Sequence, residues 1–167
     1  GGNEEGELQG KIVEKNNGYT QYTSSENDLT VSYPSDMYVA QENEGVIKVQ
    51  IFSDNDPELG VRGYTVVREV CDTADCTYDE LYKAFKESLL DGTGITILKE
   101  NTVRVDNYDT TLLEYTQDVE GQIFRGYAQV IFTNNQLYAL AGISDEPHFS
   151  QNQREIQKFL KSLTIHE

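Results

Sequence analysis

Tryptophan is absent from the 167 residues, while methionine occurs once, cysteine and histidine twice each, and proline three times. The cysteines and histidines have no spacing typical of a zinc cluster. No run of 18 apolar residues occurs, so we expect no transmembrane span. The signatures GxGxxG, GxxxxGK[ST], HExxH and GxSxG are also missing. These absences favour a protein that is not an enzyme and that carries no cofactor.

Basic residues are scarce as well: 13 Lys and Arg stand against 29 Asp and Glu, which gives a net charge of −16. The first 17 residues contribute little of this charge, so the acidity belongs to the folded part of the chain. An acidic surface repels phosphate backbones and anionic lipid head groups. We therefore expect no nucleic-acid partner, and the charge favours cations and basic protein patches.

The two cysteines are Cys71 and Cys76, with four residues between them. In an oxidising compartment they would close a small disulfide loop; two free thiols or half of a metal site are the alternatives. The disulfide would place the domain outside the cytosol, extracellular or attached to the cell envelope. The chain begins with Gly-Gly and not with Met, which suggests that a leader, and with it a lipid anchor, was removed.

Residues 1–17 are expected to form a flexible acidic lead-in, and residues 18–167 a single domain. Runs rich in Tyr, Thr and Val predict strands over 19–23, 29–33, 37–41, 46–52, 61–70, 95–105, 110–118, 122–133 and 136–143. Asn134 and Asn135 predict a hairpin turn between the last two strands. Short links between successive strands favour antiparallel pairing, and so an α+β fold.

Apolar residues at helical spacing predict two helices, over residues 77–90 and 151–163. Each is preceded by a residue pair typical of a capping box: Thr77 with Glu80, and Ser150 with Gln153.

Five segments follow one another in a recognisable order: LTVSYPSDMYV (29–39), TYDELYKAFKESL (77–89), VRVDNYDTTLLEYT (103–116), YALAGIS (138–144) and FLKSLTI (159–165). In their pattern and order these segments resemble the PsbP-like domain family. The resemblance implies an antiparallel β-sheet of about six or more strands sandwiched between helices. The family includes bacterial secreted and lipoprotein relatives of the photosystem II extrinsic protein, most of them without an assigned activity. It assigns no functional residue to this sequence.

Acidic residues gather in two predicted turns. Asp54, Asp56 and Glu58 alternate in the first, and Asp72 and Asp75 lie between the two cysteines. Calcium and similar cations bind several carboxylate oxygens at once. These five residues are therefore candidate ligands for a weak calcium or other divalent-cation site, and solvated turns without a ligand are the alternative.

Two further groups are candidate site residues. Tyr19, Tyr22, Tyr33 and Tyr38 cluster near the amino end and would form either an exposed binding face or part of the core. His148 follows two acidic residues, so it would either pair with a carboxylate or lie in a surface loop.

Together these features predict a non-catalytic, extracellular or envelope-attached binding or accessory module with an unknown protein or glycan partner. A divalent-cation-binding protein that uses the acidic turns is the first alternative. An uncharacterised hydrolase is the second.

Overall fold

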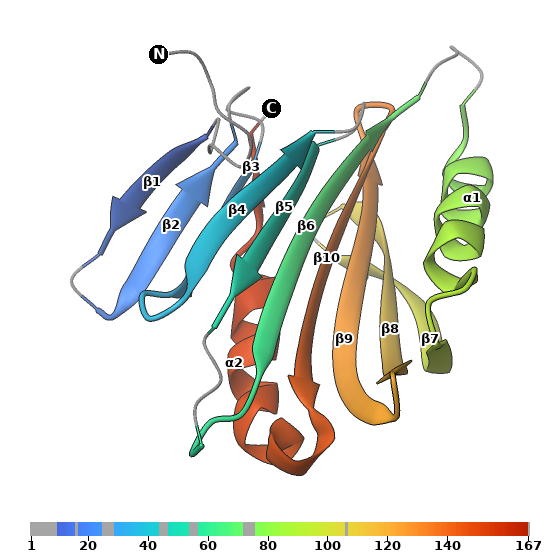
Figure 1. Ribbon diagram of the computed structural model, residues 1–167. Coiled ribbons are helices and arrows are strands. Elements are labelled where there is room, and N and C mark those ends of the chain that lie inside the picture. Colours follow the sequence, from blue (N-terminus) through green and yellow to red (C-terminus); the bar gives the residue numbers. More distant parts are fainter. Residues whose placement is uncertain are drawn as a thin grey trace.

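The computed structural model describes residues 10–15, 17–24, 29–43, 47–53, 57–71, 76–105 and 107–166. These residues form two antiparallel sheets and two α-helices. The larger sheet has the strand order β4-β5-β6-β10-β9-β8-β7 (Figure 1). Its strands are β4 (Tyr38–Asn43), β5 (Ile47–Phe52), β6 (Arg62–Val70), β7 (Ile95–Val105), β8 (Tyr108–Val119), β9 (Gln122–Thr133) and β10 (Gln136–Asp145).

The smaller sheet has four strands in the order β1-β2-β3-β11. They are β1 (Lys11–Glu14), β2 (Tyr19–Thr23), β3 (Leu29–Pro34) and the two-residue β11 (Thr164–Ile165). β11 follows the last helix and pairs with β3, so the carboxyl end of the chain is joined to a sheet built from its amino end.

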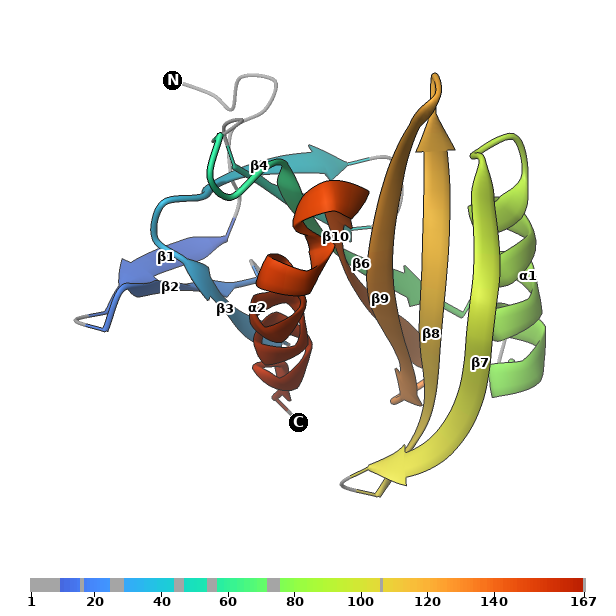
Figure 2. The same cartoon turned by 90° about the horizontal axis from the view of Figure 1, so that it is seen from below.

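The two helices lie on opposite faces of the larger sheet (Figures 1 and 2). Successive side chains of a strand point to opposite faces. In β10, Leu137 and Ala139 pack with residues of α1 (Tyr78–Leu90), whereas Tyr138 and Leu140 pack with residues of α2 (Phe149–Lys161). This double coverage explains why β10 has apolar residues on both faces.

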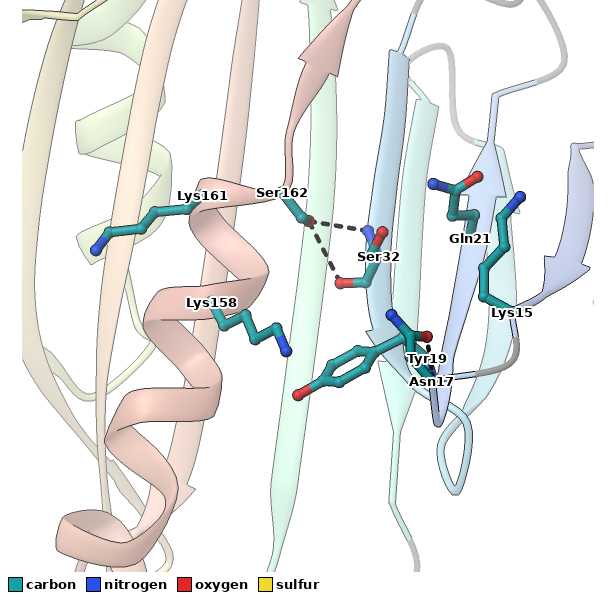
Figure 3. Close-up of a pocket in the computed structure, with 8 residues that line it drawn as sticks. All are labelled: Lys15, Asn17, Tyr19, Gln21, Ser32, Lys158, Lys161 and Ser162. Carbon is teal, nitrogen blue, oxygen red and sulfur yellow. Dashed lines mark hydrogen bonds between the residues drawn. The ribbon is translucent and has the colours of Figure 1, made fainter.

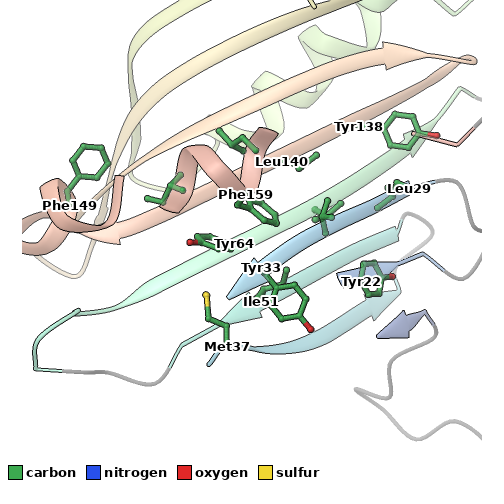
Figure 4. Packing of buried hydrophobic residues seen from close by; sticks show 14 residues of the cluster. Tyr22, Leu29, Tyr33, Met37, Ile51, Tyr64, Tyr138, Leu140, Phe149 and Phe159 are labelled. Atoms are coloured by element: carbon green, nitrogen blue, oxygen red, sulfur yellow. The ribbon is translucent and has the colours of Figure 1, made fainter. Parts of the chain in front are cut away.

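The largest core lies between the larger sheet, the smaller sheet and α2 (Figure 4). The smaller sheet contributes its alternate residues, including Tyr22 and Val31, and α2 contributes Ile156 and Phe159. The Phe159 ring stacks on Tyr64 of β6 with 4.5 Å between the ring centres. Only one face of the smaller sheet enters this core, and on β2 and β3 the residues of its other face are half-buried.

The predicted α+β fold and antiparallel pairing are confirmed, but the strands form two sheets and not the one sheet that the resemblance implies. Residues 19–23 and 29–33 belong to the separate smaller sheet. Part of the expected flexible lead-in is also a strand, since Lys11–Glu14 pairs with β2.

The helix boundaries agree in part with the predicted capping boxes. At α1, the backbone N–H of Glu80 donates to the Thr77 side chain over 3.2 Å, as predicted. At α2, the prediction is wrong: the helix begins at Phe149, directly after a 3-10 turn (Glu146–His148), and no side chain caps it. Pro147 within that turn explains the earlier start, because its fixed φ favours a helical turn.

Cys71 and Cys76 form a disulfide, with 5.7 Å between their Cα atoms. It lies directly before α1. In the part of the chain that the structure describes, neither helix has the length and apolar character needed to cross a membrane.

Candidate functional site: a lysine-lined cleft

A cleft of about 320 Å³ opens where the end of α2 meets the side of the smaller sheet that points away from the core (Figure 3). Its walls come from three separate parts of the chain: the β1–β2 turn, strands β2 and β3, and the end of α2. The lining residues are Lys15, Asn17, Tyr19, Gln21, Ser32, Lys158, Lys161 and Ser162.

Local hydrogen bonds fix the sheet side of the cleft. The backbone N–H of Lys15 donates to the Tyr19 carbonyl over 2.8 Å, which closes the β1–β2 turn. The Asn17 side chain accepts from the Tyr19 N–H over 3.2 Å. Gly18 in this turn has φ +84°, a conformation that favours glycine. The turn therefore holds Lys15 and Tyr19 together at one side of the cleft.

The helix side is joined to the sheet by Ser162, which follows the last turn of α2. Its hydroxyl accepts from the backbone N–H of Ser32 over 2.8 Å. Across the cleft, the Lys158 ammonium lies 3.9 Å from the centre of the Tyr19 ring. Lys158 points toward that ring, whereas Lys161 points away from it (Figure 3).

The lining chemistry is basic and polar. Three of its eight residues are lysines, and none is an aspartate or glutamate. Within the described residues, Lys15, Lys158 and Lys161 form no ion pair with a carboxylate. On a chain of net charge −16, this is a local reversal of sign. An anionic group would find ammonium donors here that no carboxylate of the described residues already neutralises.

An ion network around the buried Arg62 fixes α2 beside this cleft. Arg62 of β6 is 3% exposed and donates to Asp36 over 2.6 Å and to Glu155 of α2 over 2.7 Å. The Tyr64 hydroxyl donates to the same Glu155 carboxylate. Burial, with the nearby Glu155 charge as a second cause, raises the pKa of Tyr64. Because every charge in the network has a partner, its role is to hold α2 against the sheet.

The structure separates the four tyrosines that the sequence groups together. Tyr22 and Tyr33 are 0% and 2% exposed and belong to the core, so an exposed face that includes them is wrong. Both alternate with outward-facing residues along their strands, which explains their burial. Tyr38 of β4 is exposed, and Tyr19 alone lies in the cleft.

Among the described residues, the two acidic turns form no cation site. Asp54, Asp56, Asp72 and Asp75 lie outside the described residues, and Glu58 is exposed. Among the residues that are described, no group of three His, Cys, Asp or Glu side chains is placed to hold a metal ion.

His148 does pair with a carboxylate, that of Asp145, over 2.6 Å. Asp145 also accepts the Val61 backbone N–H over 3.0 Å. Nearby, the Asn152 amide donates to the Ser144 hydroxyl and to the Leu59 carbonyl. These contacts tie the start of α2 to the segment before β6, so the geometry gives the pair a structural role.

Neither a protein-family model nor a curated protein matches the sequence. Solved structures do resemble the fold. Cyanobacterial PsbP from Synechocystis sp. PCC 6803 superposes with a TM-score of 0.65 at 13% identity, over 89% of this chain and 93% of its own. The chain has a PsbP-like fold.

Two further solved structures also resemble this fold. LpqN of Mycobacterium tuberculosis, described as involved in cell envelope biogenesis, has a TM-score of 0.57 at 10% identity, over 95% of this chain and 91% of its own. The Ran-binding protein Mog1p of Saccharomyces cerevisiae has a TM-score of 0.54 at 16% identity, over 95% and 96%. At such identities the likeness concerns the fold alone.

The sequence did not reveal the cleft. Lys158 and Lys161 are recognisable as polar positions of an amphipathic helix, but such positions are usually solvated. The contact that identifies the cleft is that of the Lys158 ammonium with the Tyr19 ring. It depends on how α2 packs beside β2, which the sequence does not show.

Proposed function

We propose that this chain is a non-catalytic binding or accessory module that works outside the cytosol and holds an anionic group in the lysine-lined cleft. One observation carries the proposal: within the described residues, the three lysines that line the cleft have no carboxylate partner and no acidic residue lines it, on a strongly acidic protein. The PsbP-like fold supports it, since neighbours of this fold include a Ran-binding protein and a cell-envelope protein. The disulfide supports the location.

Citrate is a suitable probe for the cleft because it is small and carries several carboxylates. In a two-dimensional NMR titration at constant ionic strength, we expect citrate to shift the amide signals of Tyr19, Ser32 and Ser162. Lys158→Ala should weaken this binding several-fold. Lys83→Ala is the matched control, since Lys83 is exposed on α1. Equal binding by both variants, or no binding at millimolar citrate, would contradict the proposal.

The cation-binding alternative is a separate hypothesis. Its test is the thermal midpoint in chelator and then with calcium, manganese or zinc, because a cation that binds only the folded state raises the midpoint.

A further inference from the structure

The cleft is one end of a larger basic face. Residues of β2 and β3 alternate between the core and solvent, so Tyr19, Gln21 and Thr23 point outward, as do Thr30 and Ser32. We call the solvent side of the smaller sheet, together with the adjoining cleft, the outer face.

Strand β1 extends the outer face away from the cleft. Paired residues of neighbouring strands share a face. Lys11 pairs with Thr23 and Val13 with Gln21, which places both on the outer face. Glu14 pairs with the core-facing Thr20 and therefore lies on the opposite side. The acidic residue of β1 is thus turned away while its lysine faces out.

The outer face is basic from one side to the other. It carries Lys11 and Lys15 at the β1 side and Lys158 and Lys161 at the α2 side. Like the cleft lysines, Lys11 forms no ion pair within the described residues. On the far strand, Thr164 pairs with Thr30, whose hydroxyl is 2.8 Å from His166 Nε2. No aspartate or glutamate in the described parts of the four strands points to this side.

We infer that the outer face docks an acidic segment of another protein, with the cleft holding one of its carboxylates; this rests on the proposed function of the cleft. The distances favour an extended segment over a small anion. Lys11 begins β1 and lies four residues before the cleft residue Lys15, about 13 Å away at about 3.4 Å per residue, whereas an ion pair reaches only about 4 Å. A small anion held in the cleft cannot also contact Lys11, but about five residues of extended chain can reach from the cleft to Lys11.

The remaining chemistry of the outer face also suits a peptide. Its threonine, serine and glutamine side chains both donate and accept hydrogen bonds, as peptide groups do. A long polyanion such as nucleic acid would extend beyond this face onto the rest of a surface of net charge −16, which repels it. A short acidic segment confines its charge to the basic area.

The experiment compares two probes, a fluorescently labelled decaglutamate peptide and citrate, on the full chain. Lys158→Glu should weaken both. Lys11→Glu, which is remote from the cleft, should weaken the peptide about 5-fold, the effect of about 1 kcal/mol, and leave citrate binding unchanged. Lys83→Glu makes the same charge change on α1 and should affect neither probe beyond a small general loss.

The outcomes separate the two proposals. If citrate binds the cleft but Lys11→Glu weakens the peptide no more than Lys83→Glu does, the docking face is refuted and the cleft remains. If a heparin oligosaccharide binds more tightly than the peptide with the same dependence on Lys11, the partner is a polyanion and not an acidic protein. If neither citrate nor the peptide binds, the proposed function fails as well.

Discussion

The Lys158 ammonium lies 3.9 Å from the centre of the Tyr19 ring and joins the outer surface of α2 to that of the smaller sheet. A cation over an aromatic face is attracted to the ring, and the attraction is about 0.5–1 kcal/mol at exposed sites. The contact has a second consequence, because it aims the ammonium into the cleft. Loss of the ring should therefore affect both stability and binding.

A double-mutant cycle measures this coupling. We expect Tyr19→Leu and Lys158→Met to destabilise the protein individually, and the double variant to lose about 0.5–1 kcal/mol less than the sum of the two. Urea unfolding gives the three free energies. Effects that add within about 0.3 kcal/mol would show that the contact contributes nothing.

Gly60 should tolerate no side chain. It has φ +71°, and a Cβ there would lie 2.2 Å from Asp145 Oδ1 and 2.4 Å from His148 Nδ1. Gly60→Ala should therefore disrupt the Asp145–His148 pair that anchors the start of α2. Gly92 has a similar φ of +66° but nothing within 4 Å of an added Cβ.

Gly92→Ala therefore measures the backbone cost alone, about 1–2 kcal/mol. We expect Gly60→Ala to lower the free energy of unfolding by clearly more than Gly92→Ala in the same urea titration. An equal loss in the two variants would mean that the contacts of Asp145 and His148 shift aside without cost.

Much of the fold follows from local patterns in the sequence. The helix over 77–90 and the hairpin at Asn134-Asn135 depend on neighbouring residues, and both are confirmed; the two asparagines have the positive φ values of 55° and 57° that such a turn needs. The split into two sheets depends on pairings between distant segments, such as β3 with β11, and no local pattern encodes them.

The local charge of the candidate site could not be predicted from the sequence either. Net charge is an average over the chain, and here it predicts cationic partners. The outer face has the opposite sign because the β1–β2 register places Lys11 on this face and Glu14 on the opposite one, and because α2 brings Lys158 to Tyr19. Neither arrangement can be read from composition or from spacing within one element.

Loss of the disulfide should reduce stability by a moderate amount. The bond between Cys71 and Cys76 closes a short loop, and loop-closure entropy gives about 2 kcal/mol for such a length. We expect Cys71→Ser to lower the free energy of unfolding by about this amount, and a reductant to lower that of the unsubstituted protein equally. A reductant without effect would show that the cross-link does not restrict the unfolded chain.

The Glu114 ion pair should make stability depend on pH in the acid range. The Arg125 guanidinium donates to the Glu114 carboxylate over 2.6 Å and holds the pKa of Glu114 below its usual value. A lowered pKa in the folded state means that the carboxylate adds stability above its unfolded pKa of about 4.3 and that this contribution is lost as the pH falls through the folded value.

Glu114→Gln removes the contribution. The difference in free energy of unfolding between the unsubstituted protein and this variant should thus be constant near neutral pH and shrink below about pH 4.3. Urea titrations between pH 7 and 3 measure it, with Glu87→Gln on the exposed side of α1 as the control. A difference that stays constant down to pH 3 would show that the charge of Glu114 does not stabilise the fold, and that Arg125 is held instead by its contact with Phe149, whose ring centre lies 4.8 Å from the guanidinium carbon.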